Sequence, residues 1–292
     1  MSARDDPGGR RDSNMTWEQA VAALLEDPEQ GSLARDCYFD GTPAQAGERY
    51  WASAEWQAAR HLLPEAAGNA LDVGAGRGIV SYALARDGWS VCALEPDASA
   101  LVGAGAIREL VAVTGYPIDV VESFGENLPF EDEEFQLIVA RQSLHHARDL
   151  SALTRELFRV LRPGGRLLAM RDHVISRARD LPRFYQAHPL HRLYGGEHAY
   201  LLSEYTAALR DAGFTLNKVM GPLESAINYA PLTPDSLAAG IADQVPDFFC
   251  SRRIARRLLR SPVIMPMALK FLRRVDNRPG RLYSFIADRA GA

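Results

Sequence analysis

The chemistry-bearing residues of this chain begin with the stretch Leu71-Asp72-Val73-Gly74-Ala75-Gly76-Arg77-Gly78. A short apolar run ends in an acid, three glycines alternate with other residues, and a helical pattern starts at Ile79. Glycine accepts positive φ and lets a ligand approach the main chain. The N-terminus of the following helix offers free N–H groups and a partial positive charge. The stretch predicts a turn that binds a nucleotide-containing ligand, although a purely structural strand–helix turn has the same pattern.

The spacing of the glycines separates two kinds of nucleotide. A dinucleotide fingerprint reads G-x-G-x-x-G, whereas the third glycine here comes one residue early, which disfavours a nicotinamide-dependent oxidoreductase. A second acid, Glu95, ends the apolar run 91–94, 17 residues after Gly78. An acid at that end of a strand can accept both hydroxyls of a ribose, or it can cap the helix that we expect near Asp97.

Four further motifs follow in order: Gly125-Glu126-Asn127-Leu128-Pro129-Phe130, Phe135 to Ala140, Leu144-His145-His146 and Glu156 to Leu167. With the glycine loop, this series resembles the class I S-adenosylmethionine (SAM) methyltransferases, in particular the ubiquinone/menaquinone-biosynthesis (type 11) domain. The resemblance covers roughly residues 45–220. One departure is Gln136, where the family usually has Asp. The resemblance implies a SAM-dependent methyltransferase that releases S-adenosylhomocysteine.

The resemblance also implies cofactor contacts, residue by residue. The glycine loop packs against the methionine part of SAM, the acid before it helps to hold the amino group, and the asparagine and leucine of the third motif lie beside adenine. With the positions that follow the second and fourth strands, the expected cofactor residues are Asp72, Gly74, Ala75, Gly76, Gly78, Glu95, Pro96, Glu126, Asn127, Leu128, Arg141, Gln142 and His146.

Methyl transfer from a sulfonium requires a positioned acceptor and, where a proton must leave, a base. Histidine is the usual base near neutral pH, and His173 and His145 follow predicted strands, so we take them as catalytic candidates. A dense polar and aromatic stretch supplies the expected substrate wall: His191, Tyr194, His198 and Tyr200.

The same stretch raises the question of a metal site. His188 and His191, with Glu197 and His198 after them, have the residue types of a metal cluster. Pro189 interrupts the helix that the pair would need. We therefore expect a wall of the substrate pocket and no metal.

Alternating apolar strands and amphipathic helices predict an α/β fold with a parallel sheet covered on both faces. Strands are expected near 69–73, 91–95, 118–122, 135–141, 166–171, 214–220 and 281–288, with helices near 77–87, 97–113, 150–161, 179–189 and 203–212. The resemblance implies a Rossmann-like seven-stranded sheet whose last strand is antiparallel and lies between the fifth and sixth. The expected parts are a disordered tail (1–14), an N-terminal helical cap (15–64) with helices from Trp17 and from Arg49 to Leu63, the core (65–222), a helical insertion (223–277) and the last strand with the C-terminus (278–292).

The insertion is basic: residues 252–281 hold ten Lys and Arg and one acid, Asp276. We expect it to act with residues 179–200 as a lid that sets acceptor specificity, because long loops at ligand-facing strand ends are usually functional. The charge hints at an anionic or carrier-bound acceptor, and a solvated surface is the alternative. The prolines at 262 and 266 disfavour one long amphipathic helix and hence peripheral membrane contact.

Composition narrows the class of protein. A net charge of −4 over 292 residues gives no reason to expect nucleic-acid binding. Cys37, Cys92 and Cys250 lack disulfide or zinc spacing, and no signal peptide pattern opens the chain, so we expect a cytoplasmic protein. The acceptor is expected to be a small molecule from secondary metabolism or cell-envelope synthesis, methylated on O, N or C. A SAM-fold subunit without transfer activity is the second interpretation, and no pattern indicates an oligomeric state.

Overall fold

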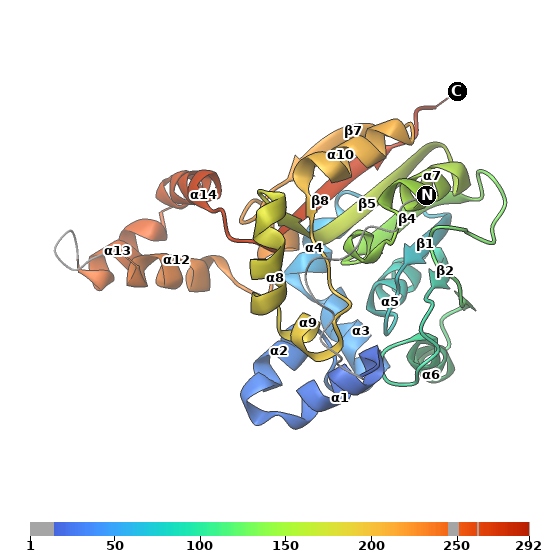
Figure 1. The fold of residues 1–292 in the computed structure, drawn as a ribbon, viewed down its shortest axis with the longest axis horizontal. Helices are drawn as coiled ribbons and strands as arrows, with labels where there is room; N and C mark the ends of the chain where they lie inside the picture. Colours follow the sequence, from blue (N-terminus) through green and yellow to red (C-terminus); the bar gives the residue numbers. More distant parts are fainter. Residues whose placement is uncertain (1–14, 245–250, 262, 292) are drawn as a thin grey trace.

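The structure is a computed structural model that describes residues 15–244, 251–261 and 263–291. The expected tail 1–14, Cys250 and Pro262 lie outside these residues. The described residues form one sheet in the order β3-β2-β1-β4-β5-β8-β7, and β6 pairs with β5 (Figure 1). The strands are β1 (Asn69–Val73), β2 (Ser90–Leu94), β3 (Ile118–Val121), β4 (Phe135–Arg141), β5 (Leu161–Ile175), β6 (Tyr200–Leu201), β7 (Thr215–Met220) and β8 (Arg281–Asp288).

The predicted sheet is confirmed, with one addition. Strand β8 runs antiparallel to both β5 and β7 and lies between them, as the resemblance implied. The two-residue β6, which pairs in parallel with the end of β5, was not predicted. Strand β5 also begins earlier than expected. The turn at Pro163-Gly164-Gly165 is an irregularity inside the β4–β5 ladder, which pairs Phe135 with Leu161 and resumes at Leu137 with Arg166.

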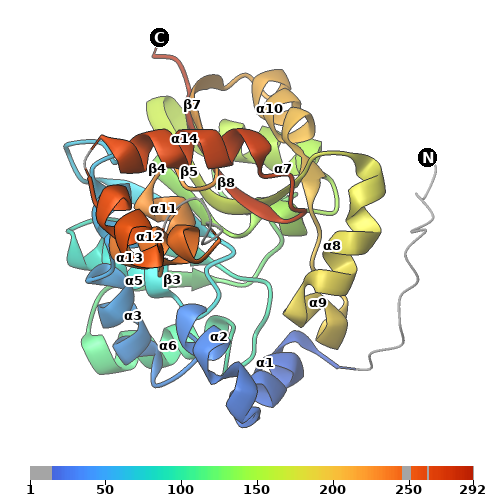
Figure 2. The same cartoon turned by 90° about the vertical axis from the view of Figure 1, so that its left-hand side faces the viewer.

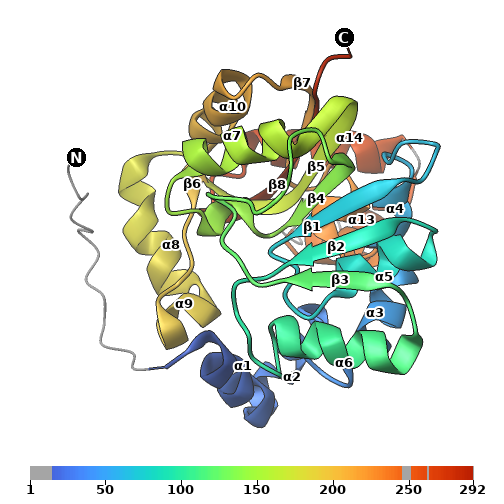
Figure 3. The same ribbon diagram turned by 90° about the vertical axis from the view of Figure 1, so that its right-hand side faces the viewer.

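Helices cover both faces of the sheet, and successive strand residues point to opposite faces. Leu137 and Val139 pack with α3 (Pro43–Trp51), α4 (Ala54–Arg60), α5 (Ile79–Arg86) and α6 (Ala104–Thr114). Ile138 and Ala140 pack with α7 (Leu150–Val160) and α10 (Leu202–Asp211). Figure 3 shows α7 and α10 above the strands, and α3 and α6 below them. The layered α/β architecture is thus the predicted one.

Several helix boundaries differ from the prediction. The expected helix 49–63 is two helices, because Ser53 caps α4 by accepting a hydrogen bond from the Trp56 N–H. Helix α6 starts at Ala104 and not near Asp97. Pro189 does not disrupt a helix but opens α9 (Pro189–Tyr194), after α8 (Leu181–Ala187), since proline suits the first helical turn. Helix α1 (Trp17–Glu26) begins at Trp17 as predicted, behind a capping box of Thr16 and Gln19, and α2 (Gly31–Asp36) was not predicted.

The insertion contains α11 (Ala226–Tyr229), α12 (Pro234–Asp243), α13 (Arg252–Leu259) and α14 (Ile264–Val275). Helices α12 to α14 stand at one side of the molecule (Figures 1 and 2) and share a small core of their own. Part of the basic charge is neutralised inside the insertion, where Arg256 pairs with Asp243 and Arg260 with Asp235. In the described part of the chain, no helix has both the length and the apolar character needed to cross a membrane.

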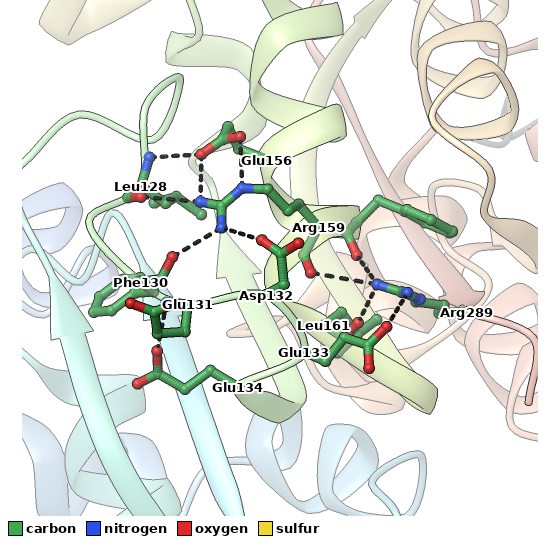
Figure 4. A network of polar contacts seen from close by, with 11 residues as sticks. Leu128, Phe130, Glu131, Asp132, Glu133, Glu134, Glu156, Arg159, Leu161 and Arg289 are labelled. Carbon is green, nitrogen blue, oxygen red and sulfur yellow. Dashed lines mark hydrogen bonds and ion pairs between the residues drawn. The ribbon is translucent and has the colours of Figure 1, made fainter.

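The sequence motifs 125–130 and 156–167 meet in one polar network (Figure 4). Arg159 on α7 donates to the carbonyls of Leu128 and Phe130 and pairs with Asp132 and Glu156. At the end of the same helix, Arg289 donates to the Phe158, Arg159 and Leu161 carbonyls. This network satisfies carbonyls that a helix C-terminus leaves unpaired, so part of the family resemblance reflects a structural requirement.

Asp87 helps to fasten the N-terminal cap to α5, beside the contacts of Glu48 with Tyr82 and Arg86. Asp87, at the end of α5, accepts hydrogen bonds from the indole N–H groups of Trp51 (2.8 Å) and Trp56 (3.0 Å). Trp56 is fully buried. The cap therefore depends on one acid for two otherwise unsatisfied donors.

Replacing this acid should weaken the protein measurably. We expect Asp87→Ala to lower the free energy of unfolding by about 1–3 kcal/mol, because a buried N–H group loses its acceptor. Urea unfolding followed by fluorescence measures the change. In a Trp56→Phe background, where no indole N–H remains at position 56, Asp87→Ala should cost clearly less. An equal cost in both backgrounds would show that this hydrogen bond is not the cause.

Candidate active site

A cavity of about 1440 Å³ opens at the carboxyl ends of the central strands. Its walls come from the segment before α3, the glycine loop, the ends of β2, β4 and β5, and residues 178–204. In open α/β sheets ligands bind outside the carboxyl ends of the strands, so this is the expected place for a site. Arg77 ties the glycine loop to the N-terminal segment by donating to the carbonyls of Tyr38, Phe39 and Gly41.

The glycine loop adopts the geometry that its sequence predicts. Gly74, Gly76 and Gly78 have φ values of 67°, 55° and 79°, a region that other residues rarely enter. The Gly76 N–H donates to one carboxylate oxygen of Glu95 at 2.7 Å, and the Asp97 N–H donates to the other at 2.9 Å. Burial raises the pKa of the Glu95 carboxyl, and these two hydrogen bonds partly oppose that shift. Backbone and acid thus meet at the cavity wall.

Asp72, at the end of β1, also lines the cavity but is almost fully buried. Its carboxylate accepts a 2.6 Å hydrogen bond from the Ser81 hydroxyl. Burial outweighs this bond and raises the pKa of Asp72 to about 7. A carboxylate in such a place costs stability unless a cation or further donors compensate it.

A buried ion cluster forms another wall. Glu55 on α4 forms a bidentate pair with Arg141 at the end of β4 (2.6 and 3.1 Å) and lies 3.4 Å from Arg171 on β5. Arg171 also donates to the carbonyls of Ile227 and Ala230. Burial would raise the pKa of Glu55, but the two guanidinium groups lower it overall. One carboxylate therefore balances two buried cations that face the cavity.

The two catalytic candidates lie together. The ring centroids of His145 and His173 are 4.7 Å apart. Nδ1 of His145 lies 2.9 Å from Asp172, and its Nε2 lies 3.3 Å from Glu197. These acids outweigh the effect of burial and raise the pKa of His145 to about 9. Burial, together with neighbouring histidines, lowers the pKa of His173 well below its usual range.

The expected substrate wall lies next to these histidines, since His188 packs against His173 and Glu197 contacts His145. Tyr185 stacks on His191 with ring centroids 4.1 Å apart, and its hydroxyl lies 2.8 Å from Nδ1 of His198. Tyr194 packs against Trp17 of the cap and donates to Glu197. This side of the cavity is therefore aromatic and rich in imidazole groups.

Comparison with known proteins identifies the domain. A methyltransferase domain family matches residues 71–169. This segment belongs to that family. The uncharacterized protein YafE of Escherichia coli is 31% identical over 162 residues, which cover 56% of this chain and 66% of YafE. The demethylmenaquinone methyltransferase of Mycobacterium marinum is 33% identical over 156 residues, which cover 50% of this chain and 61% of that protein.

A solved structure confirms the fold over most of the chain. Geranyl diphosphate methyltransferase in complex with SAM superposes with a TM-score of 0.55 at 18% identity, covering 92% of this chain and 95% of the other. By contrast, the sequence matches span about one half to two thirds of the length of the curated relatives. The segment 71–169 that matches the methyltransferase domain family thus includes the glycine loop and the ends of β1, β2 and β4.

The cavity of the methyltransferase domain collects all but three of the residues predicted for the site. Gly78 instead packs against Ile107. Leu128 is buried in the core beside α7. Neither Leu128 nor Asn127 lines the cavity, whereas residues 123–126 do. The roles of all these residues toward a ligand stay predictions.

Some of the wall has no sequence signal. Glu55, Arg171 and Tyr38 line or support the cavity, yet none belongs to a motif. The insertion contributes only Pro231 among its described residues. The expectation that α12 to α14 cover the cavity is therefore not supported, whereas residues 179–200 do form its wall.

Removing the charge of Glu55 should strongly destabilise the domain. We expect Glu55→Gln to lower the free energy of unfolding by about 3–5 kcal/mol, because two buried guanidinium groups lose their only countercharge among the described residues. Chemical denaturation measures this. The matched control is Asp243→Asn, which breaks the exposed pair with Arg256 and should cost less than about 1 kcal/mol. Similar losses in both variants would contradict this interpretation.

The raised pKa of Asp72 predicts a pH-dependent stability. The native pKa of about 7 exceeds the ordinary value of 3.8, so the native state binds more protons between these values. This contribution to stability is complete below pH 4 and is lost as the pH rises to 7. Asp72→Asn keeps an acceptor for Ser81 but carries no charge. Its unfolding free energy, relative to the wild type, should rise between pH 4 and 7 and then stay constant. A difference that does not change with pH would refute the assignment.

Proposed function

We propose that the protein is a SAM-dependent methyltransferase that acts on a small-molecule acceptor. The observation that carries the proposal is the hydrogen bond between the Gly76 N–H and Glu95 at the cavity wall. It brings a ligand-accessible glycine turn and a ribose-binding acid together, inside a methyltransferase domain. The fold shared with geranyl diphosphate methyltransferase, whose structure holds SAM, supports the choice of cofactor.

The cofactor is proposed to lie along the ends of β1 and β2. Glu95 accepts the ribose hydroxyls, and Asp72 compensates the positive charge of the amino group, which would also relieve its own burial. Gly74 and Gly76 contact the methionine part. We place adenine beside Phe124 and Glu126, which line the cavity, rather than beside Asn127, which does not.

The acceptor is proposed to lie between the glycine loop and the wall formed by His173, His191, His198 and Tyr200. An in-line displacement needs the acceptor atom to face the sulfonium methyl group from this side. His145 and His173, the two catalytic candidates, line this part of the cavity and would position the acceptor atom there. The acceptor atom and its molecule follow from none of these contacts.

The position of the basic insertion gives no support for the anionic or carrier-bound acceptor that its sequence suggested. Because α12 to α14 do not line the cavity, their charge does not indicate an anionic or carrier-bound acceptor. Met267 and Phe271 on α14 are exposed beside Lys270 and Arg274. This combination keeps peripheral membrane contact as an alternative role for the insertion, and vesicle flotation with and without anionic lipid would test it.

Cofactor binding gives the direct test. Isothermal titration should show that the wild type binds S-adenosylhomocysteine and that Gly76→Val and Glu95→Ala do not bind it measurably. A side chain at position 76 meets no protein atom closer than 3.8 Å and would fill ligand space. Loss of Glu95 removes charge-assisted hydrogen bonds of about 1.5–3 kcal/mol each.

The matched control is Glu109→Ala, an exposed acid on α6, which should bind like the wild type. Undiminished binding in both pocket variants would refute the proposed pocket. Formation of S-adenosylhomocysteine from SAM across a metabolite panel then separates an enzyme from the alternative, a SAM-binding subunit without transfer activity.

A further inference from the structure

Three buried side chains at the acceptor end of the cavity converge on one point. His145 follows β4, His173 lies near the end of β5, and Glu197 precedes β6. One ligand atom from each lies within 4.8 Å of the ligand atoms of the other two. We propose that these residues bind a divalent transition-metal ion.

The distances suit a metal centre after small side-chain rotations. Metal bonds to nitrogen and oxygen of about 2.0–2.2 Å place neighbouring ligand atoms about 3.0–3.5 Å apart. Nε2 of His145 and the Glu197 oxygen are already 3.3 Å apart. The other separations are at most 4.8 Å and would shorten by up to about 1.3–1.8 Å, a change that rotamer adjustments of His173 or Glu197 supply.

The stronger evidence is the set of partners behind the three ligands. Histidine ligands almost always donate their other ring N–H to a carboxylate or a backbone carbonyl. Nδ1 of His145 lies 2.9 Å from Asp172, and Nδ1 of His173 lies 3.0 Å from the Gly280 carbonyl. Both Nε2 atoms are thereby left as the metal-binding nitrogens. The second oxygen of Glu197 accepts the Tyr194 hydroxyl at 2.9 Å, which orients the carboxylate.

A hydrogen-bonded network without metal explains only part of this arrangement. It accounts for His145, which lies between two acids. It does not explain why a ligand atom of His173 lies within 4.8 Å of those of His145 and Glu197, since Nδ1 of His173 already has the Gly280 carbonyl as its partner. Two imidazole groups and one carboxylate converging on one point form a set that a shared cation would fit.

The ligand types limit the metal and its use. Two imidazoles and one carboxylate suit Fe(II), Mn(II), Co(II) or Zn(II) more than Mg(II) or Ca(II), which prefer oxygen ligands. All three residues line the cavity, so the open coordination positions face it. On the proposed function, an oxygen atom of the acceptor would occupy one of these positions and fix the acceptor near the cofactor.

The test uses full-length, tag-free protein that has been stripped with a chelator. Titration with Co(II), followed by visible absorption and by elemental analysis after gel filtration, should give one equivalent of tightly bound metal. His173→Gln and Glu197→Gln should abolish stoichiometric binding. Asp172→Asn should weaken binding by about 10–100-fold, because it leaves the ligands in place and removes an outer partner. The control His61→Gln, an exposed histidine outside the cavity, should bind like the wild type.

X-ray absorption on the Zn(II)-loaded wild type keeps the test independent of variant folding. Two imidazoles in the first coordination shell are expected. The proposal is overturned if the wild type holds no stoichiometric metal, if its bound metal shows no imidazole, or if folded His173→Gln and Glu197→Gln bind as it does. S-adenosylhomocysteine binding, measured in parallel, shows separately whether the proposed cofactor function fails.

Discussion

The arrangement of the cavity depends on one buried carboxylate, Glu55, held between Arg141 and Arg171. These three residues come from the helical cap, from β4 and from β5. Isolated buried charges are expensive, so the cluster holds only while all three elements stay in place. Arg171 extends the constraint by binding the carbonyls of residues 227 and 230, where the insertion leaves the core. Cap, sheet and insertion are thus joined by electrostatics at the edge of the cavity.

The same cluster fixes backbone conformations that would otherwise be unfavourable. Gln142 and Arg171 have φ values of 53° and 62°, in the left-handed region. Such residues cost about 1–3 kcal/mol each and persist only where their surroundings determine them. Arg141 holds Gln142 in this conformation, because its guanidinium binds both Glu55 and the Gln142 side chain. Gln142 lies three positions before His145, and Arg171 lies two positions before His173. The strained backbone therefore helps to orient these two histidine side chains.

The sequence was sufficient for the sheet and for the glycine loop because both are local properties. Apolar strands, a glycine turn and an acid at a strand end are contiguous patterns whose geometry follows from backbone preferences. The sequence was insufficient where one residue is compatible with two structural roles. Leu128 belongs to a family motif, but it supports the Arg159 network and the core. Pro189 begins a helix that it was expected to interrupt. The direction in which the insertion leaves the core depends on the contacts of Arg171, and no local sequence pattern encodes these contacts.

The acceptor end of the cavity was the least predictable part for the same physical reason. His145, His173 and Glu197 are separated by tens of residues, and only the parallel ladder of β4 with β5 and the pairing of β6 bring them together. From the sequence, only a neighbouring set around His188 and His191 came into question as a metal cluster, because those residues share one short segment, and we expected a pocket wall there and no metal. In the folded protein, side chains from the ends of different strands converge on one point instead. A glycine turn is therefore readable as a motif, whereas the cluster of His145, His173 and Glu197 exists only once the sheet has formed.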